Sequence, residues 1–281
     1  MEDRVRKLEG FRRFLVENEK SVATIQKYLF EVGEFYDFLG DREADKLLLV
    51  QYRERLQKCY RPQTVNGKLS AVHAYLGYVG RRELRVKYLK VQRRAYVEER
   101  RELTQGEYRR LLEAAKRRGR EQLYYIMVTL CSTGIRISEL EYITVEAVNR
   151  GRAEVCMKGK NRIVILPRSL VIKLKDFARK RAIKKGSIFC SRNGRPLDRS
   201  NICHEMKKNC GEAGVEESKV FPHNLRHLFA RVYYSQEKDL VRLADILGHS
   251  SVNTTRIYTM ESGENHLRQL EKMNLLIDRY N

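Results

Sequence analysis

The sequence lacks any apolar run near the length of a membrane span, and its first ten residues, MEDRVRKLEG, contain no apolar signal-peptide core. Because a bilayer-spanning helix needs about 20 consecutive apolar residues, we expect no membrane segment and a cytoplasmic location. Internal repeats and low-complexity tracts are also absent. With 281 residues, 42% hydrophobic and 9% aromatic, the composition is typical of a folded protein, and its length favours two domains.

Cysteine pairs of the Cys-x-x-Cys type are missing, although the chain has six cysteines. We therefore expect reduced, mostly buried thiols rather than disulfides. Cys203, His204 and Cys210 are near enough in sequence to suggest a metal site, but no second pair of ligands accompanies them, so a structural role is favoured. We expect neither a metal nor a cofactor.

Acidic residues are few relative to basic ones: 36 Asp and Glu stand against 57 Lys and Arg, which gives a net charge of +21. The excess is spread along the chain, with 21 basic and 13 acidic residues in positions 1–95 and 36 and 23 in the remainder. An ordinary charged surface would mix the signs and leave a modest net charge. The uniform excess favours nucleic acid as a partner, since phosphate neutralisation by Lys and Arg releases condensed counterions.

Apolar periodicity predicts a helical bundle in the first eighty residues, with Lys and Arg on its outside. One helix is expected between Ser21, a capping residue, and Gly40, and Pro62 separates two further helical stretches. The last helix should end near Gly80. It is indicated by apolar residues at helical spacings: Val65, Leu69, Val72, Leu76 and Val79.

The periodicity fades between Arg85 and Arg101, where RVKYLKVQRRAYVEERR contains seven basic residues. This composition indicates a connector between domains that suits a protein wrapping a duplex. Thr104 and Glu107 then form a Thr-x-x-Glu capping box that begins a helix. We therefore assign residues 1–84 to a helical domain, 85–101 to a basic linker and 102–281 to a second domain.

In the second domain, LYYIMVTLCSTG predicts a buried helix that ends at Gly134, and AEVCMKGKNRIVILP predicts two short strands around a Lys-Gly-Lys-Asn turn. Further helices are expected over LVIKLKDFARK, RSNICHEMKKNCGEAG, NLRHLFARVYYSQ and LVRLADILG. The expected fold class is mainly α with a small β-sheet.

A set of basic residues followed by a tyrosine suggests phosphodiester transfer without a metal. This chemistry needs directional cationic donors on the phosphate, a nucleophile in line and a proton source for the leaving oxygen. Arginines offer planar forks of donors, and a phenol, with a pKa of about 10, needs nearby cations and a base to become reactive. Each residue alone is explained by packing or solvation. The informative feature is their combination in this order: Arg136, Lys160, His223, Arg226, His249 and Tyr258.

In its motifs TGIRISEL, KGKNR, HNLRH, LADILGHSS and TTRIYT, the chain resembles the tyrosine recombinases, the family of phage-type integrases and Xer-type recombinases. Tyr258 follows His249 by nine residues, as the family pattern requires. Residues 1–95 are similar to the family's small core-binding domain. The resemblance thus implies a helical, SAM-like N-terminal DNA-binding bundle and a mixed α/β catalytic domain.

The resemblance also implies a role for each motif residue. Arg136 and Arg226 would clamp the scissile phosphate, and Tyr258 would attack it to form a 3′-phosphotyrosyl linkage. His223 and His249 would assist proton transfer and hold the phosphate. Lys160 would protonate the 5′-hydroxyl leaving group. The stored bond energy would allow strands to be rejoined without ATP or a metal.

Two positions near these motifs stay open. The turn KGKNR is shorter than the one frequent in the family, so Lys158 competes with Lys160 for the role of general acid, and we favour Lys160 because it follows Gly159 at the turn. Glu139, three residues after Arg136, is placed to orient that arginine, although an exposed glutamate on a helix surface is the interpretation we favour.

The segment ESGENHLRQLEKMNLLIDRY after Tyr258 predicts an amphipathic tail helix. The resemblance implies that this tail docks on a neighbouring subunit of a homotetramer on paired DNA sites, and packing on its own domain is the alternative. The partners implied are double-stranded DNA recombination sites, in integration and excision of a mobile element or in Xer-like dimer resolution. Two rival functions are a type IB topoisomerase and a catalytically silent DNA-binding protein of the same fold; the complete set of motif residues and the helical N-terminal domain favour a recombinase.

Overall fold

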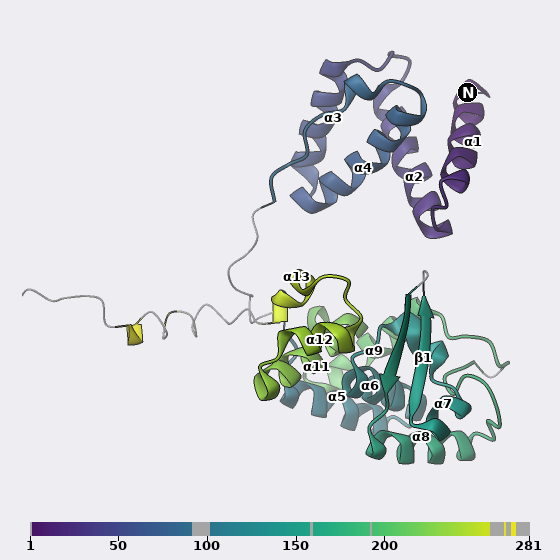
Figure 1. The fold of residues 1–281 in the computed structure, drawn as a ribbon, viewed down its shortest axis with the longest axis vertical. Coiled ribbons are helices and arrows are strands. Elements are labelled where there is room, and N and C mark those ends of the chain that lie inside the picture. The colour runs from purple at the N-terminus through teal and green to yellow at the C-terminus, as the bar shows by residue number, and fades with distance from the viewer. Residues whose placement is uncertain are drawn as a thin grey trace, which may run out of the picture. The chain divides into compact units, whose positions relative to one another are not determined.

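The computed structural model describes residues 2–91, 102–157, 160–191, 193–258, 267 and 271–273. The chain divides into two compact units, Met1–Arg93 and Arg94–Asn281. The described residues are mainly helical and contain one two-stranded sheet, which confirms the fold class predicted from the sequence (Figure 1). No helix in these described ranges is long and apolar enough to cross a membrane.

The helices of the first unit begin and end where the sequence predicts. The side chain of Ser21 accepts a hydrogen bond from the Thr24 N–H, and Gly40 follows the helix with a φ of 60°, which glycine adopts without strain. Pro62 occupies the first turn of the last long helix, where its missing N–H is not needed. The elements are α1 (Glu2–Glu17), α2 (Val22–Leu39), α3 (Lys46–Cys59), α4 (Pro62–Tyr78) and the 3-10 turn η1 (Arg82–Leu84).

The core of this unit lies where α2 and α4 pack together. Lys68 on α4 departs from the expected placement of basic residues on the outside, since it is 6% exposed. Its Nζ donates to Glu31 Oε2 at 2.6 Å, and this pairing offsets the cost of burying a charge. The residues that are at most 1% exposed here are Phe11, Leu15, Val32, Phe35, Leu49, Val65, Leu69, Ala71 and Val72.

The first part of the predicted linker lies against α4. The Val86 N–H donates to His73 Nε2 at 3.3 Å, and the side-chain amide of Asn66 both donates to and accepts from the backbone of Leu89. These contacts hold residues 86–89 on the first unit. Residues 92–101 of the linker lie outside the described residues.

The second unit begins with the predicted capping box: Glu107 N–H donates to Thr104 Oγ1 at 3.1 Å, and Thr104 N–H donates to Glu107 Oε2 at 2.8 Å. Its helices are α5 (Gln105–Arg117), α6 (Glu121–Thr133), α7 (Val145–Arg150), α8 (Arg168–Lys180), α9 (Arg199–Lys208), α10 (Cys210–Ala213), α11 (Pro222–Glu237), α12 (Leu240–Leu247) and α13 (Val252–Thr255). The described residues of this unit also include the 3-10 helices η3 (Ile137–Tyr142), η4 (Glu217–Lys219) and η5 (Arg256–Tyr258).

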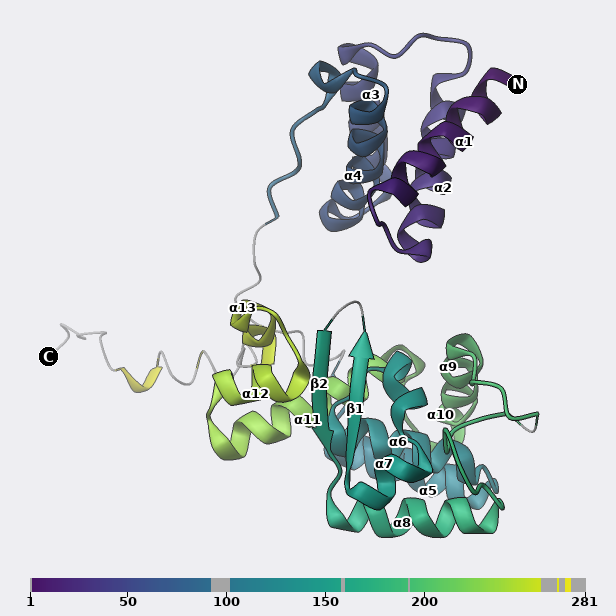
Figure 2. The same cartoon turned by 45° about the vertical axis from the view of Figure 1, so that its right-hand side comes forward.

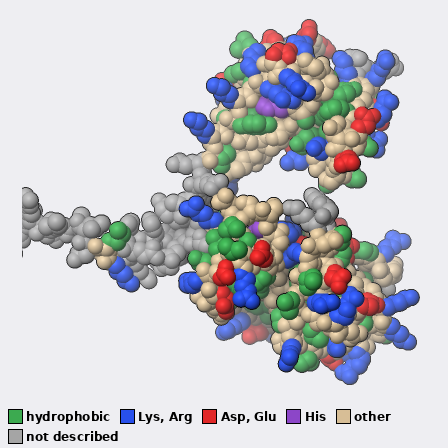
Figure 3. Space-filling model, viewed as in Figure 1, with side chains coloured by type: hydrophobic (Ala, Val, Ile, Leu, Met, Phe, Trp, Pro, Cys, Tyr) green, Lys and Arg blue, Asp and Glu red, His purple; other side chains and the backbone are tan. Residues whose placement is uncertain are grey.

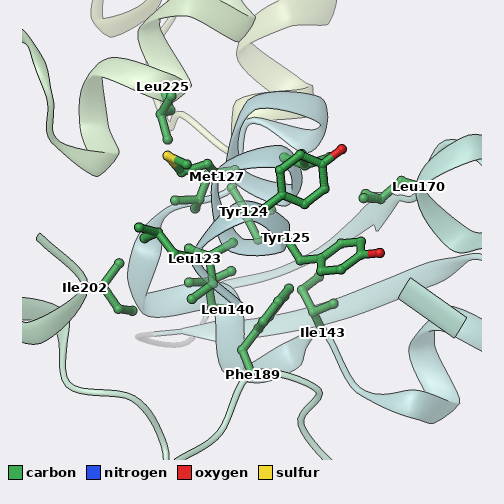
Figure 4. Packing of buried hydrophobic residues seen from close by; sticks show 14 of the residues in the cluster. Leu123, Tyr124, Tyr125, Met127, Leu140, Ile143, Leu170, Phe189, Ile202 and Leu225 are labelled. Atoms are coloured by element: carbon green, nitrogen blue, oxygen red, sulfur yellow. The ribbon is translucent and has the colours of Figure 1, made fainter. Parts of the chain in front are cut away.

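Helix α6 is the centre of this unit and is buried along nearly its whole length, as its apolar sequence predicts. Figure 4 shows Tyr124, Tyr125 and Met127 of α6 among side chains from several other elements. Leu170 comes from α8 and Leu225 from α11, and both are at most 2% exposed. The end of α6, which carries the Arg136 motif, is therefore held by a packed core.

The predicted hairpin consists of β1 (Arg152–Met157) and β2 (Lys160–Ile165), which pair antiparallel (Figure 2). Side chains alternate between its two faces: Ala153, Val155 and Val164 are buried, whereas Ile163 and Ile165 are exposed. The register pairs Met157 with Lys160, and Lys158 and Gly159, between them in sequence, lie outside the described residues.

Two expectations from the sequence are wrong in part. The helix predicted over RSNICHEMKKNCGEAG is divided into α9 and α10 at Asn209, a buried residue whose side chain donates to the Leu111 carbonyl at 2.9 Å. The cysteines are free thiols, but only Cys210 is buried, while Cys59 and Cys156 are exposed. Cys156 is exposed because it lies on the outer face of the hairpin, opposite Asn161.

Basic side chains are distributed over both units on the face shown in Figure 3, with Asp and Glu among them. The predicted tail helix after Tyr258 falls mostly outside the described residues, so its docking stays a prediction.

Candidate active site

Arg136 lies just beyond the end of α6, where the chain turns sharply. Gly134 ends the helix with a φ of 64°, and a Cβ at this position would clash with the Phe229 ring on α11. Only glycine therefore fits both the left-handed backbone and the close approach of α11. The turn places Arg136 at the start of η3 with 41% of its side chain exposed, so its guanidinium is accessible to a ligand.

Glu139 orients Arg136, and the favoured interpretation of Glu139 as a surface residue is wrong. The Glu139 side chain is 2% exposed. Its Oε2 accepts from the Arg136 backbone N–H at 2.7 Å, and its Oε1 accepts from Arg136 Nη1 at 3.0 Å. Burial raises the pKa of Glu139, but the Arg136 N–H and the Arg162 guanidinium outweigh it and hold the pKa below its ordinary value. The carboxylate is thus ionised and fixes the arginine.

Arg162 on β2 is a site residue that sequence reasoning missed. Its Nη2 donates to Glu139 Oε2 at 2.6 Å, and its Nη1 donates to the Ile246 carbonyl at the end of α12. These bonds join the hairpin to the Arg136 turn and to the loop that carries His249. The sequence feature that could have identified Arg162 is its place in the KGKNR motif, two residues after Lys160 on the same strand.

Arg226 is the most deeply buried of the site residues, with 1% exposure on α11. Its Nη1 donates to the Gly134 carbonyl at 2.5 Å and its Nη2 to the Leu247 carbonyl at 2.7 Å, so it satisfies the C-terminal ends of α6 and α12. Burial, followed by the charge of Arg136, lowers the pKa of Arg226 to about 10. At neutral pH it remains a cation.

His249 contacts Arg226 directly. The two atoms Arg226 Nη2 and His249 Nε2 are 3.0 Å apart, and His249 Nδ1 lies 2.8 Å from Thr255 Oγ1. Burial, followed by the charges of Arg226, Arg136 and Arg162, lowers the pKa of His249 to about 4. The imidazole is therefore neutral at pH 7.

His223 lies in the first turn of α11, and burial followed by the charges of Arg226 and Arg136 lowers its pKa. The ring centroids of His223 and His227 are 4.5 Å apart. The His227 ring in turn meets the Tyr258 ring edge-on, with their centroids 5.0 Å apart. His227 was present in the HNLRH motif but was not selected from the sequence. Its buried Nε2 has no hydrogen-bond partner, and burial lowers its pKa to about 4.

Tyr258 is 4% exposed and packs with Leu243, Leu247 and Ala230. Its ring lies parallel to that of His249, with centroids 6.2 Å apart. Burial raises the pKa of the Tyr258 phenol, whereas the positive charges of Arg226 and Arg136 act in the opposite direction. The phenol is thus protonated at neutral pH in this structure.

The structure brings five of the six predicted residues together: Arg136, His223, Arg226, His249 and Tyr258. An open cleft of about 800 Å³ lies beside them and is lined by Arg136, Arg162, Asn161, Gly248 and His249, among others. Lys160 begins β2, two residues before Arg162, so its strand reaches this site. The choice between Lys160 and Lys158 is left open by the described residues.

Metal-binding side chains are not grouped in the described part of the chain: no three His, Cys, Asp or Glu residues there are arranged to hold an ion. The positive charge at the site comes instead from Arg136, Arg162 and Arg226. Such a set of guanidinium groups is suited to an oxyanion such as a phosphodiester.

Comparison with known proteins points to one family. The model of the phage integrase family matches residues 101–264, a segment that contains all six predicted site residues. The chain is 29% identical over 283 residues to the tyrosine recombinase XerA of Thermococcus kodakarensis, and the match covers 97% of this chain and 96% of that protein.

Two solved structures share the fold. The crystal structure of XerA recombinase matches with a TM-score of 0.53 and 26% identity over 99% of this chain and 100% of that one. A lambda integrase tetramer bound to a Holliday junction matches with a TM-score of 0.71 and 17% identity, covering 98% and 79% of the two chains. The similarity therefore includes both units, and at 17% identity the second match concerns the fold alone.

Proposed function

This chain belongs to the phage integrase family of tyrosine recombinases, and we propose that its catalytic residues are Arg136, Lys160, His223, Arg226, His249 and Tyr258. The protein is a site-specific recombinase that cleaves and rejoins DNA strands. The observation that carries the assignment of residues is the meeting of Arg226, His249 and Tyr258, which come from three separate elements.

Arg136 and Arg226 bind the non-bridging oxygens of the scissile phosphate. Arg136 is available to do so because its side chain is 41% exposed, while the Glu139 carboxylate accepts from its Nη1 and fixes its position. Arg226 is held rigidly by two backbone carbonyls, so it is pre-organised and loses little conformational entropy when the phosphate arrives. Together they neutralise the charge that develops during the transfer.

Tyr258 attacks the phosphorus, the phenolic oxygen bonds to it, and the bond to the 5′-oxygen breaks. His223 and His249 are neutral at pH 7 because their pKa values are lowered, so either is in the form that accepts the phenolic proton. Lys160 delivers a proton to the departing 5′-oxygen. Rejoining reverses these steps with the 5′-hydroxyl of another strand.

The burial of Tyr258 adds one requirement to this mechanism. With 4% exposure the phenol is packed against apolar side chains of α11 and α12 and is absent from the lining of the cleft. The attack therefore requires the side chains that cover Tyr258 and the still more buried Arg226 to open toward the cleft when DNA binds.

The partners follow from the same assignment. We assign residues 1–84 to DNA binding, 85–101 to the basic linker and 102–281 to catalysis, and we expect a homotetramer on two paired recombination sites. The lambda integrase tetramer on a Holliday junction supports this assembly, as does the net charge of +21. The tail after Tyr258 would then dock on a neighbouring subunit. The biological role is integration and excision of a mobile element or Xer-like dimer resolution.

Trapping of a covalent adduct tests this function. A nicked suicide DNA site incubated with the protein in EDTA should yield a covalent protein–DNA complex, and Tyr258→Phe should abolish it. Tyr234→Phe, at another tyrosine of the same apolar cluster, is the control and should form the adduct. A persistent adduct in the Tyr258 variant, or an absolute need for Mg²⁺, would show that the assigned mechanism is wrong.

A further inference from the structure

We propose that Thr255 is a positioning residue whose hydroxyl hydrogen-bonds to His249 Nδ1 in both neutral tautomers of the ring. In the first tautomer His249 Nε2 accepts from Arg226, and in the second it donates to the scissile phosphate. This inference has two states, one for each tautomer, and the second, in which the ring contacts the phosphate, rests on the proposed function. Its first state is visible in the contacts of the protein alone, where Thr255 Oγ1 lies 2.8 Å from His249 Nδ1.

The first tautomer follows from donor and acceptor chemistry. An arginine guanidinium only donates hydrogen bonds, so His249 Nε2, 3.0 Å from Arg226 Nη2, must accept. The ring proton of a neutral imidazole then sits on Nδ1, which donates to Thr255 Oγ1. Protonation of both nitrogens is disfavoured first by burial and then by the positive charges of Arg226, Arg136 and Arg162, with the His223 imidazole also near.

Thr255 is fixed well enough to act as this anchor. It is fully buried, at 0% exposure, and ends α13, a short helix capped by Ser251 and packed beside α12. A threonine side chain has few χ1 rotamers, so a buried one presents its hydroxyl in one direction. Thr255 also lies three residues before Tyr258, which ties the position of the His249 ring to that of the nucleophile.

The second tautomer is required by the substrate. A phosphate oxygen of a diester only accepts, so a His249 that contacts it from Nε2 must carry a proton there, and Nδ1 must accept instead. A hydroxyl both donates and accepts, whereas a backbone carbonyl only accepts and would hold the ring in the first tautomer. Thr255 therefore serves both states by rotating its O–H. One proton leaves Nδ1 and one arrives at Nε2 through solvent, so the ring stays neutral.

Histidine nitrogen resonances test the first state directly. In the full-length protein labelled with ¹⁵N-histidine, the His249 signals, identified by their loss in His249→Gln, should show one tautomer with the proton on Nδ1. Thr255→Val, which keeps the shape and removes the hydroxyl, should shift or average these signals, while Thr255→Ser should retain them. Thr129→Val is the control, because this buried hydroxyl bonds only to the Tyr125 carbonyl within α6.

Adduct formation on a suicide DNA site tests the second state. Thr255→Val should slow it by about tenfold, the effect of about one lost hydrogen bond, and Thr255→Ser should restore most of the rate. Unchanged His249 signals in Thr255→Val, or an equal loss of rate in Thr255→Ser, would overturn the proposal. Failure of the wild type to form any adduct would instead overturn the proposed function, and the nitrogen signals would still decide the first state.

Discussion

Glu139 and Arg162 form a buried ion pair of 2.6 Å that joins the β-hairpin to the turn carrying Arg136. The two side chains are 2% and 14% exposed, and the second oxygen of Glu139 holds Arg136 itself. The position of Arg136, the first of the two arginines proposed to bind the phosphate, is thereby coupled to the hairpin on which the general acid is proposed to lie. This relationship is the basis of the first prediction.

Arg162→Met should lower the free energy of unfolding by about 2–3 kcal/mol, because it removes one of the cations paired with the buried Glu139 carboxylate and the Arg162 donor to the Ile246 carbonyl. It should also slow adduct formation, since Arg136 loses part of its support. Urea denaturation and suicide-site cleavage measure the two effects. Arg179→Met is the control: the Arg179 side chain pairs with Asp176 but is 81% exposed, so its loss should change neither measurement appreciably. Equal effects in the two variants would contradict a special role for Arg162.

Gly248→Ala should be more harmful than the same change at Gly186. Both glycines have a left-handed φ, 63° and 76°, so alanine at either position costs about 1 kcal/mol of backbone strain. At Gly186 nothing lies within 4 Å of the new Cβ, whereas at Gly248 it would meet Arg162 Cδ at 2.5 Å. Arg162 is held by its two hydrogen bonds, so the Gly248 variant should lose both additional stability and cleavage rate. Thermal unfolding of both variants and suicide-site cleavage give the comparison.

The two arginines proposed to bind the phosphate should differ in their contribution to stability. Arg226→Ala leaves the carbonyls of Gly134 and Leu247 without their donor and opens a buried space, so it should cost about 3 kcal/mol. Arg136→Ala should cost about 1 kcal/mol, because that side chain is 41% exposed. Both variants should lose adduct formation and keep most of their DNA affinity, which depends on many phosphate contacts. If DNA affinity and cleavage fall equally, the arginines serve binding alone.

His227→Phe should flatten the dependence of stability on pH. Burial lowers the pKa of His227 to about 4, whereas in the unfolded chain a histidine has a pKa of about 6.5. The contribution of neutral His227 to the free energy of unfolding is fully present above the pKa that the histidine has in the unfolded chain. It is lost as pH falls from about 6.5 to about 4, at a slope of up to about 1.4 kcal/mol per pH unit. Phenylalanine fills the same site without titrating. Urea unfolding at pH 7, 6 and 5 measures the difference, and parallel curves would contradict the burial of a neutral His227.

The sequence by itself indicated most of the longer helices, the hairpin and the candidate reactive residues. Ser21, Thr104 and Gly134 mark element ends because capping and left-handed backbone are local properties that a few adjacent residues decide. The break between α9 and α10 was not visible, since it depends on a bond from Asn209 to Leu111, 98 residues away. A linear pattern does not contain such a partner.

Only the tertiary structure decided how the site is supported. Glu139 and Arg162 have sequence contexts that fit a surface, and they are buried because α12 and the hairpin close over them. Thr255 and His227 acquire roles from the rings beside them, and Tyr258 is covered by α11 and α12. Burial and pKa depend on which elements pack together, so the motif order supplied the candidate reacting groups, and the packing determined which side chains hold them and in which protonation state.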